Sequence, residues 1–342
     1  MVSKNDSTSD QGGGNTLGRL KEFWHVVALS RELPSGRSLK RDFYGKRLLL
    51  WRDSFGQVRA MDDCCAHRQA PLQVVDYTAG SIVCPYHGWT YDREGVLCGV
   101  PSDPTYAQRS RCQIPTYLTV EKSGFIWICP DKRSEGQIPR EDLWPHLDLD
   151  SYDRWPVCYL QKEFATSDEL LIDNFMDPTH TAVVHDGLIR SSKQSSFHEM
   201  TVSTHRYGVR VDFAEQQEKV GVGLRLIFGS TMRVQHTDEF LMPNLVRVTY
   251  TINARTCFCA LIACTPLGPL GSGRTLAHVQ LRYHFGWPDS IVRLVIGRLA
   301  RKVLEQDWRI TADQFENIAR FPEDRKSTRL NSSHANISYA VF

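Results

Sequence analysis

Two short cysteine–histidine pairs limit what this chain of 342 residues can fold into. Cys65 stands two residues before His67, and Cys84 stands three residues before His87. Each pair supplies one thiolate and one imidazole from a short loop, so two loops can close on one metal centre. A lone cysteine or histidine is usually a core residue, but four in this order favour a metal site. The ligand types alone permit either a Cys2His2 zinc site or a [2Fe–2S] cluster with mixed ligands.

The sequence around the pairs favours the cluster. Cys65-x-His67-Arg68 and Cys84-Pro85-Tyr86-His87-Gly88-Trp89-x-Tyr91-Asp92 resemble the Rieske motif of ring-hydroxylating and demethylating oxygenases. The resemblance implies that the cluster is bound by Cys65, His67, Cys84 and His87. The ligand loops lack the extra cysteines typical of respiratory Rieske proteins, so the motif resembles the oxygenase type.

The neighbours of these ligands have predicted roles of their own. Gly88 would let its loop turn closely around the cluster, because glycine tolerates backbone conformations that other residues avoid. Trp89 and Tyr91 would shield the cluster from water, which tunes its potential. Only Cys65 has the required spacing to the first histidine, so we interpret Cys64 as a packed neighbour.

A second group of potential ligands lies in residues 173–185, most of which belong to a helix that we predict at residues 168–184. Four residues separate His180 from His185, and positions five apart on a regular helix point about 140° away from each other. Convergence on one metal therefore requires a bend or a π-type bulge between them. A purely structural role is the alternative for such a pair. Asn174 and Asp177 precede His180 at three-residue spacing, so the three would share one face of the helix.

The pattern Asn-x-x-Asp-x-x-His-x-x-x-x-His is similar to the metal-binding stretch of Rieske oxygenase α subunits. It implies that His180 and His185 belong to a 2-His-1-carboxylate Fe(II) site with positions open for O2 and substrate. The resemblance also implies that Asp177 links His180 to His87 of an adjacent subunit for electron transfer, and that Asn174 supports the site. A helix cap is the alternative for Asp177, because Asp before Pro is common at helix starts.

The resemblance implies that the third iron ligand is an acidic residue on a late helix, and we predict such a helix at residues 290–320. The apolar stripe of this helix runs through Ile296, Leu299, Val303 and Ile310, and Asp307 interrupts it on the same face. A carboxylate on a buried face is costly unless a cation neutralises it. Asp313, near Arg309 and Glu316, falls on the solvated side. We therefore predict Asp307 as the ligand.

The order of elements predicts an α+β fold. Short β-rich runs from Trp24 onward indicate an all-β domain, and a series of strands at residues 200–264 flanked by helices indicates an antiparallel sheet covered on one side. The resemblance implies a Rieske domain followed by a helix-grip, START-like catalytic domain. The predicted boundaries are a disordered tail at 1–16, the Rieske domain at 17–135, the catalytic domain at 136–322 and a disordered or non-native tail at 323–342.

Composition excludes several other classes. The formal net charge is only +2, from 41 basic and 39 acidic residues, which argues against nucleic-acid binding. Ten cysteines combined with a polar N-terminal segment favour a reducing cytoplasm over a secreted disulfide framework. The longest apolar run, at residues 258–270, contains two prolines and is too short for a membrane span.

The resemblance implies an oxygenase component that uses O2 to hydroxylate or oxidatively demethylate an aromatic or polycyclic substrate. A ferredoxin or flavin-containing reductase would bring electrons from NAD(P)H, since no Gly-rich nucleotide fingerprint follows a predicted strand. The family implies a homotrimer. The chain length resembles that of the shorter, demethylase-like α subunits, which implies a monooxygenase. The alternatives are a cis-dihydroxylating dioxygenase α subunit, a Rieske protein limited to electron transfer, and a zinc-stabilised binding module.

We expect the substrate pocket to draw on residues 170–184 and on the strands between residues 200 and 284. Strand register decides which side chains face inward, and a shift of one residue reverses them. Four apolar side chains of this region are predicted to belong to the core rather than the pocket: Phe228, Met232, Phe240 and Leu241.

Overall fold

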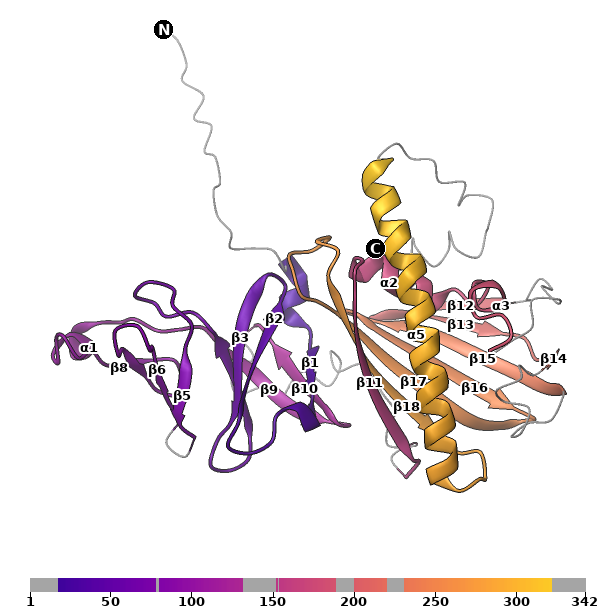
Figure 1. Cartoon of the computed structure of the whole chain (residues 1–342), viewed down its shortest axis with the longest axis horizontal. Helices are drawn as coiled ribbons and strands as arrows, with labels where there is room; N and C mark the ends of the chain where they lie inside the picture. The colour runs from indigo at the N-terminus through magenta and orange to yellow at the C-terminus, as the bar shows by residue number, and fades with distance from the viewer. Residues whose placement is uncertain are drawn as a thin grey trace, which may run out of the picture.

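Three antiparallel sheets follow one another along the longest axis of the molecule (Figure 1). The computed structural model describes residues 18–77, 80–131, 152, 154–188, 200–219 and 231–321. The predicted tails at 1–16 and 323–342, and the predicted boundary between residues 135 and 136, lie outside these ranges. Among the described residues, no helix is long and apolar enough to cross a membrane.

The middle sheet has six strands in the order β1-β10-β9-β4-β3-β2. Its strands are β1 (His25–Leu29), β2 (Ser38–Phe43), β3 (Lys46–Arg52), β4 (Val58–Asp62), β9 (Thr116–Lys122) and β10 (Phe125–Cys129). Every residue of β1 and β10 is buried, as expected of strands that are covered on both faces. Two short 3-10 helices, Gly18–Glu22 and Ser30–Glu32, flank β1.

A small four-stranded sheet extends from the middle sheet at one end of the molecule (Figure 1). It consists of β5 (Gln73–Asp76), β6 (Ser81–Val83), β7 (Thr90–Tyr91) and β8 (Leu97–Gly99), followed by the one-turn helix α1 (Tyr106–Arg109). A separate hydrophobic cluster that includes Leu72, Ile82 and Tyr91 supports it. The two predicted ligand loops precede β5 and β7.

The third sheet has eight strands, and the long helix α5 (Asp289–Arg320) crosses it (Figure 1). Its order is β11-β18-β17-β16-β15-β13-β12, with β14 paired to β15. The strands are β11 (Val157–Phe164), β12 (Met200–His205), β13 (Gly208–Phe213), β14 (Gln216–Lys219), β15 (Thr231–Leu241), β16 (Leu245–Ile252), β17 (Arg255–Pro266) and β18 (Thr275–Tyr283). An all-β domain followed by an antiparallel sheet with helices on one side confirms the predicted α+β fold class.

The predicted helix at residues 168–184 is two helices, so the expectation of one continuous helix is wrong. Helix α2 (Asp168–Met176) ends before Asp177, and α3 (Thr181–Val184) forms one further turn. Pro178 has no backbone N–H for the helical hydrogen bond, and it forces the preceding residue out of the helical region. Asp177 accordingly has φ −98° and ψ 103°.

Helix α5 begins one residue before the predicted range and ends at the predicted residue. The predicted apolar stripe is wrong at Ile310, whose side chain is 46% exposed. The buried face instead continues from Asp307 to Thr311, one helical turn further. Leu304 and Ile296 are buried on the same face.

The middle sheet packs against the eight-stranded sheet through a shared apolar cluster. Trp24, Phe125 and Trp127 contribute from the first half of the chain, while Leu245 and Leu261 contribute from the second. The Thr265 hydroxyl also donates to the carbonyl of Val26 at 2.6 Å. This interface therefore holds the two halves of the chain in one arrangement.

Two histidines without any exposed surface should make the fold sensitive to acid. Burial lowers the pKa of His25 to about 4, although a hydrogen bond to the Leu20 carbonyl opposes the change. Burial, together with the charge of Arg41, lowers the pKa of His278 to about 3. The unfolded chain takes up a proton near pH 6.5, so stability is full above that pH and falls progressively as the pH drops toward 4.

We expect each buried histidine to remove up to about 2 kcal/mol of stability between pH 7.5 and pH 5. Urea unfolding followed by near-ultraviolet circular dichroism at both pH values would measure the loss. His278→Leu should lose less stability than the wild type over this interval, while the exposed His284→Leu should match the wild type. Equal losses in the wild type and His278→Leu would contradict this account.

Candidate metal centres and substrate pocket

The two loops that carry the cysteine–histidine pairs have the same backbone hydrogen bonds. In each loop the cysteine N–H donates to the carbonyl five residues later, at 2.8 Å for both Cys65 and Cys84. The residue four positions after the cysteine donates back to its carbonyl, from Gln69 at 2.8 Å and from Gly88 at 2.9 Å. Both of these residues have positive φ, +57° and +71°. The predicted turn at Gly88 is present, and a Cβ there would lie only 2.9 Å from Pro101.

The four predicted cluster ligands divide into a buried half and an exposed half. The Cys65 and Cys84 side chains are buried and form no disulfide. The His67 and His87 rings lie at the surface with their centroids 4.6 Å apart. Limited burial and the nearby charges of His67 and Arg68 lower the pKa of His87, which favours the neutral imidazole that a metal binds. These residues can hold a two-iron cluster with its sulfur ligands inside and its imidazoles facing outward.

Aromatic side chains surround this centre. Trp89 stacks on His67 with 4.7 Å between ring centroids and an interplanar angle of 6°. The Tyr91 hydroxyl lies 3.2 Å from the Cys65 Sγ, and burial and this sulfur raise the pKa of Tyr91 well above its usual range. The hydroxyl therefore keeps its proton and can donate to a thiolate. The prediction that Cys64 is packed is wrong, since its side chain is exposed: the chain turns only Cys65 inward.

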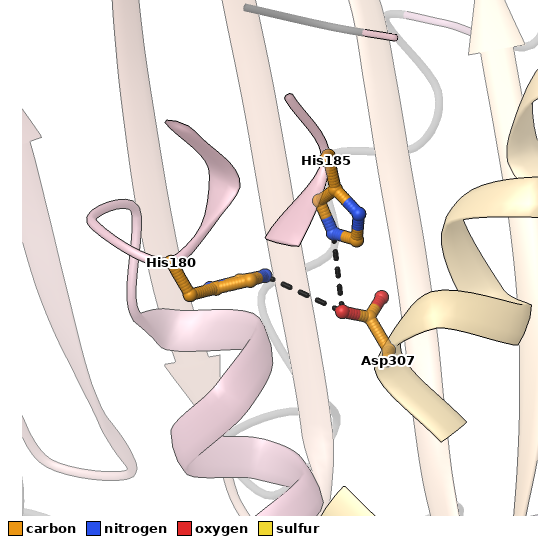
Figure 2. A group of neighbouring side chains, drawn as sticks. All are labelled: His180, His185 and Asp307. Atoms are coloured by element: carbon orange, nitrogen blue, oxygen red, sulfur yellow. Dashed lines mark ion pairs between the residues drawn. The ribbon is translucent and has the colours of Figure 1, made fainter. Parts of the chain in front are cut away.

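The second predicted centre brings together side chains from two distant parts of the chain (Figure 2). His180 precedes α3, His185 follows it, and Asp307 projects from α5. The Nε2 atoms of His180 and His185 lie 3.4 and 3.1 Å from the same Asp307 oxygen, Oδ1. One short helix between the histidines replaces the predicted bend or bulge: the backbone is extended at Asp177 before it and leaves the helical conformation at His185.

The other ring nitrogen of each histidine is held by the protein. His180 Nδ1 donates to the Asp177 carbonyl, and His185 Nδ1 donates to Gln306 Oε1 at 2.9 Å. With the proton on Nδ1, the lone pair of each Nε2 points toward Asp307. Both imidazoles are therefore oriented as ligands.

The arrangement fits a metal ion better than a hydrogen-bonded cluster. Asp307 is only 1% exposed, and its Oδ1 accepts no hydrogen bond from any described residue. Burial alone would raise the pKa of Asp307, and only positive charge at the two Nε2 atoms, from protons or from a metal ion in their place, lowers that pKa and keeps Asp307 a carboxylate. Neighbouring ligands about 2.1 Å from a metal and about 90° apart lie about 3.0 Å from each other, close to the distances found. The three residues can hold a divalent ion such as Fe(II).

The other predicted site residues lie nearby in different roles. The Asp177 carboxylate accepts hydrogen bonds from the N–H and the hydroxyl of Thr179, at 2.7 and 2.6 Å, which form an Asx turn before α3. Asn174 lies in α2, and its buried Nδ2 donates to no described residue. Because the helix breaks at Asp177, the prediction that Asn174, Asp177 and His180 share one helical face is wrong. Asp313 is exposed, as predicted.

A cavity of about 230 Å³ adjoins the three-residue centre. Helix α5 covers one side of it and the inner face of β15, β16, β17 and β18 forms the other. Its apolar lining includes Phe175, Met232, Val248, Ile252, Phe258, Ala260, Ile262, Val279, Leu281, Phe285, Ile296, Leu299, Ala300, Val303 and Leu304. The prediction that Met232 belongs only to the core is wrong, because the register of β15 turns it into the cavity. Phe240 and Leu241 are core residues, and Phe228 lies outside the described residues.

Sequence reasoning missed four polar residues of this region. Gln306 orients His185, and its position next to Asp307 was the available signal. His236, Asp238 and Tyr250 line the cavity. His236 and Asp238 interrupt the alternating apolar positions of β15, in the way that Asp307 interrupts the stripe of α5.

Together, a buried-thiolate, exposed-imidazole centre and a 2-His-1-carboxylate centre under a helix-grip sheet define the class of Rieske non-haem iron oxygenases. The sequence agrees: residues 23–117 match the Rieske [2Fe-2S] domain, and residues 164–338, about half of the chain, match the vanillate O-demethylase oxygenase C-terminal domain. The chain belongs to the Rieske oxygenase family, and its cofactors are a [2Fe–2S] cluster and a mononuclear iron.

Individual relatives are similar over part of their length. The vanillate O-demethylase oxygenase subunit of a Pseudomonas strain is 30% identical over 200 residues, which cover 58% of this chain and 54% of that protein. Chlorophyllide a oxygenase of Chlamydomonas reinhardtii is 29% identical over 48% of this chain and 24% of that protein. The chain thus spans about half or less of these relatives. Dicamba monooxygenase bound to 3,6-dichlorosalicylic acid has the same fold, with a TM-score of 0.79, 18% identity and coverage of 94% and 96%.

Tyr91→Phe tests the hydrogen bond at the buried sulfur. A donor to a thiolate stabilises the more negative, reduced cluster, so its loss should lower the reduction potential by tens of millivolts, on the order expected for one charged hydrogen bond. A spectroelectrochemical titration would measure the change. Tyr106→Phe is the control, because this phenol lies beside Trp89 and not at the sulfur. An unchanged potential in Tyr91→Phe would show that the contact is irrelevant.

Gln306→Leu tests the orientation of His185. Losing the acceptor for Nδ1–H should weaken Fe(II) binding by about 10- to 100-fold, while Gln306→Glu, which keeps an acceptor, should retain it. Competition with an iron chelator, with cluster iron quantified separately, gives the affinity. The matched control is Gln314→Leu, the same substitution at an exposed position of α5. Wild-type affinity in Gln306→Leu would refute the role.

Proposed function

We propose that this protein is the oxygenase component of a multicomponent monooxygenase. It uses O2 and electrons from a separate NAD(P)H-dependent reductase, directly or through a ferredoxin, to hydroxylate or oxidatively demethylate an aromatic substrate. The observation that carries the proposal is the Asp307 carboxylate, buried between two oriented Nε2 atoms at the wall of an apolar cavity. A metal in a closed structural site would not need such a cavity beside it.

In this proposal His180, His185 and Asp307 hold the mononuclear iron. The iron, when bound, supplies the chemistry that activates O2. The chain supplies three ligands on one side, which leaves the cavity side open for O2 and substrate. The apolar side chains of α5 and of the sheet exclude water from the reacting groups and place the substrate against the metal.

The Rieske centre would supply electrons, with Cys65, Cys84, His67 and His87 as ligands. Within one chain the small sheet with the ligand loops lies at one end of the molecule and α3 lies toward the other, with the six-stranded sheet between them (Figure 1). Exposed imidazoles at one end, and the exposed Thr179 and Val183 beside the buried iron site at the other, favour transfer between neighbouring subunits of a homotrimer. Asp177, which lines the cavity and whose carbonyl holds His180, would lie on that route.

Monooxygenation is favoured over cis-dihydroxylation by the names of the relatives. They include a vanillate O-demethylase, a toluene-4-sulfonate monooxygenase subunit from Comamonas testosteroni and a 3-ketosteroid-9-alpha-monooxygenase from Rhodococcus rhodochrous. The division of labour would follow the predicted domains, with electron entry in residues 17–135 and oxygen chemistry in residues 136–322. A protein limited to electron transfer would have no use for the His180, His185 and Asp307 cluster.

His185→Ala tests the oxygenase function. Removing one of three iron ligands should lower product formation by at least about a hundredfold, because even the outer partners of metal ligands are worth 10- to 100-fold. The cluster lies elsewhere, so its visible spectrum should be unchanged. Reductase-coupled O2 uptake and product analysis with a panel of methoxylated aromatic compounds would provide the measurement.

His205→Ala is the matched control, because this histidine lies on β12 and contacts Glu239 rather than the iron site. It should retain both activity and spectrum. Full activity in His185→Ala would refute the assignment of the iron ligand. A bleached spectrum in His185→Ala would show that the two centres are not separate.

A further inference from the structure

The substrate cavity is polar at the iron ligands with the neighbouring Asp177 and Thr181, and again on the sheet side. Asp238 and His236 on β15 and Tyr250 on β16 form this polar patch, whereas the iron ligands come from the helices on the other side. The remaining lining of the sheet is apolar. A ligand lying across the cavity would therefore have one end at the iron and one at the polar patch.

The geometry of the patch is fixed by the sheet. His236 and Asp238 are two residues apart on one strand, so both face the cavity, and His236 Nε2 lies 3.6 Å from Asp238 Oδ2. Tyr250 pairs with His236 across the strands, and their rings stack with 5.4 Å between centroids. Phe213 stacks on the opposite side of His236 at 4.1 Å. The imidazole is thus clamped between two rings, beside a carboxylate that is only 3% exposed.

The charges around the cavity limit what can bind. No lysine or arginine occurs among the described residues that line it, whereas two carboxylates besides Asp307 do: Asp177 near the iron ligands and Asp238 on the sheet. A carboxylate or sulfonate on the substrate would lie beside the Asp238 carboxylate in a poorly solvated space, which is costly. A ligand without an anionic group avoids this cost.

The size of the cavity limits the ligand further. A volume of about 230 Å³ is below the range of about 300–1,000 Å³ that is usual for drug-sized ligands. An apolar skeleton of one or two rings is therefore favoured over a larger polycyclic one.

We propose that the polar patch selects a compact aromatic substrate without an anionic group by accepting a hydrogen bond from its hydroxyl group at Asp238. This inference rests on the proposed function, because it assumes that the cavity is the substrate site. It adds a substrate class, a hydroxylated aromatic without an anionic group, and a specificity-determining residue, Asp238. The hydroxyl at the patch would direct the opposite edge of the ring system toward the iron.

Direct binding of three matched ligands to the purified holoprotein tests the proposal. The ligands are 6-methoxy-2-naphthol, 2-methoxynaphthalene and 6-methoxynaphthalene-2-sulfonate, which carry a neutral donor, no donor and an anion, respectively. Isothermal titration calorimetry without O2 or reductase measures affinity independently of turnover. The naphthol should bind about tenfold or more tightly than each of the others, as expected for one hydrogen bond to a buried charged acceptor.

Asp238→Asn keeps the shape of the side chain and removes its charge. In this variant the preference for the naphthol over the sulfonate should shrink to about threefold or less, because the repulsion of the anion is lost. Asp212→Asn is the matched control: Asp212 lies on the neighbouring strand β13, pairs with Arg210 and does not line the cavity. It should preserve the wild-type preference.

The proposal is overturned if the sulfonate binds the wild type as tightly as the naphthol, or if none of the three binds at millimolar concentration. It is also overturned if Asp238→Asn and Asp212→Asn have the same preference. These results are distinct from failure of the oxygenase function. A correct binding preference without oxygen incorporation would refute only the proposed function, whereas incorporation into anionic substrates alone would refute only this inference.

Discussion

Three groups that would repel one another without a cation dominate the second half of this protein. The Nε2 lone pairs of His180 and His185 face the Asp307 carboxylate, and the two Nε2 atoms lie 3.4 and 3.1 Å from its Oδ1. The backbone positions each of these groups. The interruption of the helix at Pro178 places His180, the end of α3 places His185, and the buried face of α5 places Asp307. The long helix can do this only because its apolar side chains pack on the sheet. The buried face of α5 therefore contributes both to the hydrophobic core and to the iron site.

The sequence was sufficient for those parts of the structure that depend on local spacing. The two ligand loops could be recognised because each pair lies within a few residues, and Asp307 could be chosen over Asp313 because helical periodicity separates a buried from an exposed position. Both predictions depend only on the spacing of residues within a short stretch of sequence. The α+β fold class followed from the order of such elements.

Other features could not be read from spacing because they depend on tertiary structure. The break at Pro178 changed which residues share a face with His180, although the proline was visible in the sequence. Met232 is buried in the core and also lines the cavity, because strand register decides the direction of its side chain. Cys64 is exposed beside the buried Cys65 because the loop folds back on itself through hydrogen bonds that only the fold reveals.

The apolar cluster between the middle and eight-stranded sheets affects how this protein could be recombined with its relatives. Trp24, Phe125 and Trp127 cover residues such as Leu245 and Leu261 of the later sheet. A chimera joined near the end of β10 would therefore bring together two surfaces that evolved with different partners. Exchanging the Rieske domain between such proteins would require exchanging both sides of this contact. Domains that are separate in the sequence are therefore not independent in folding.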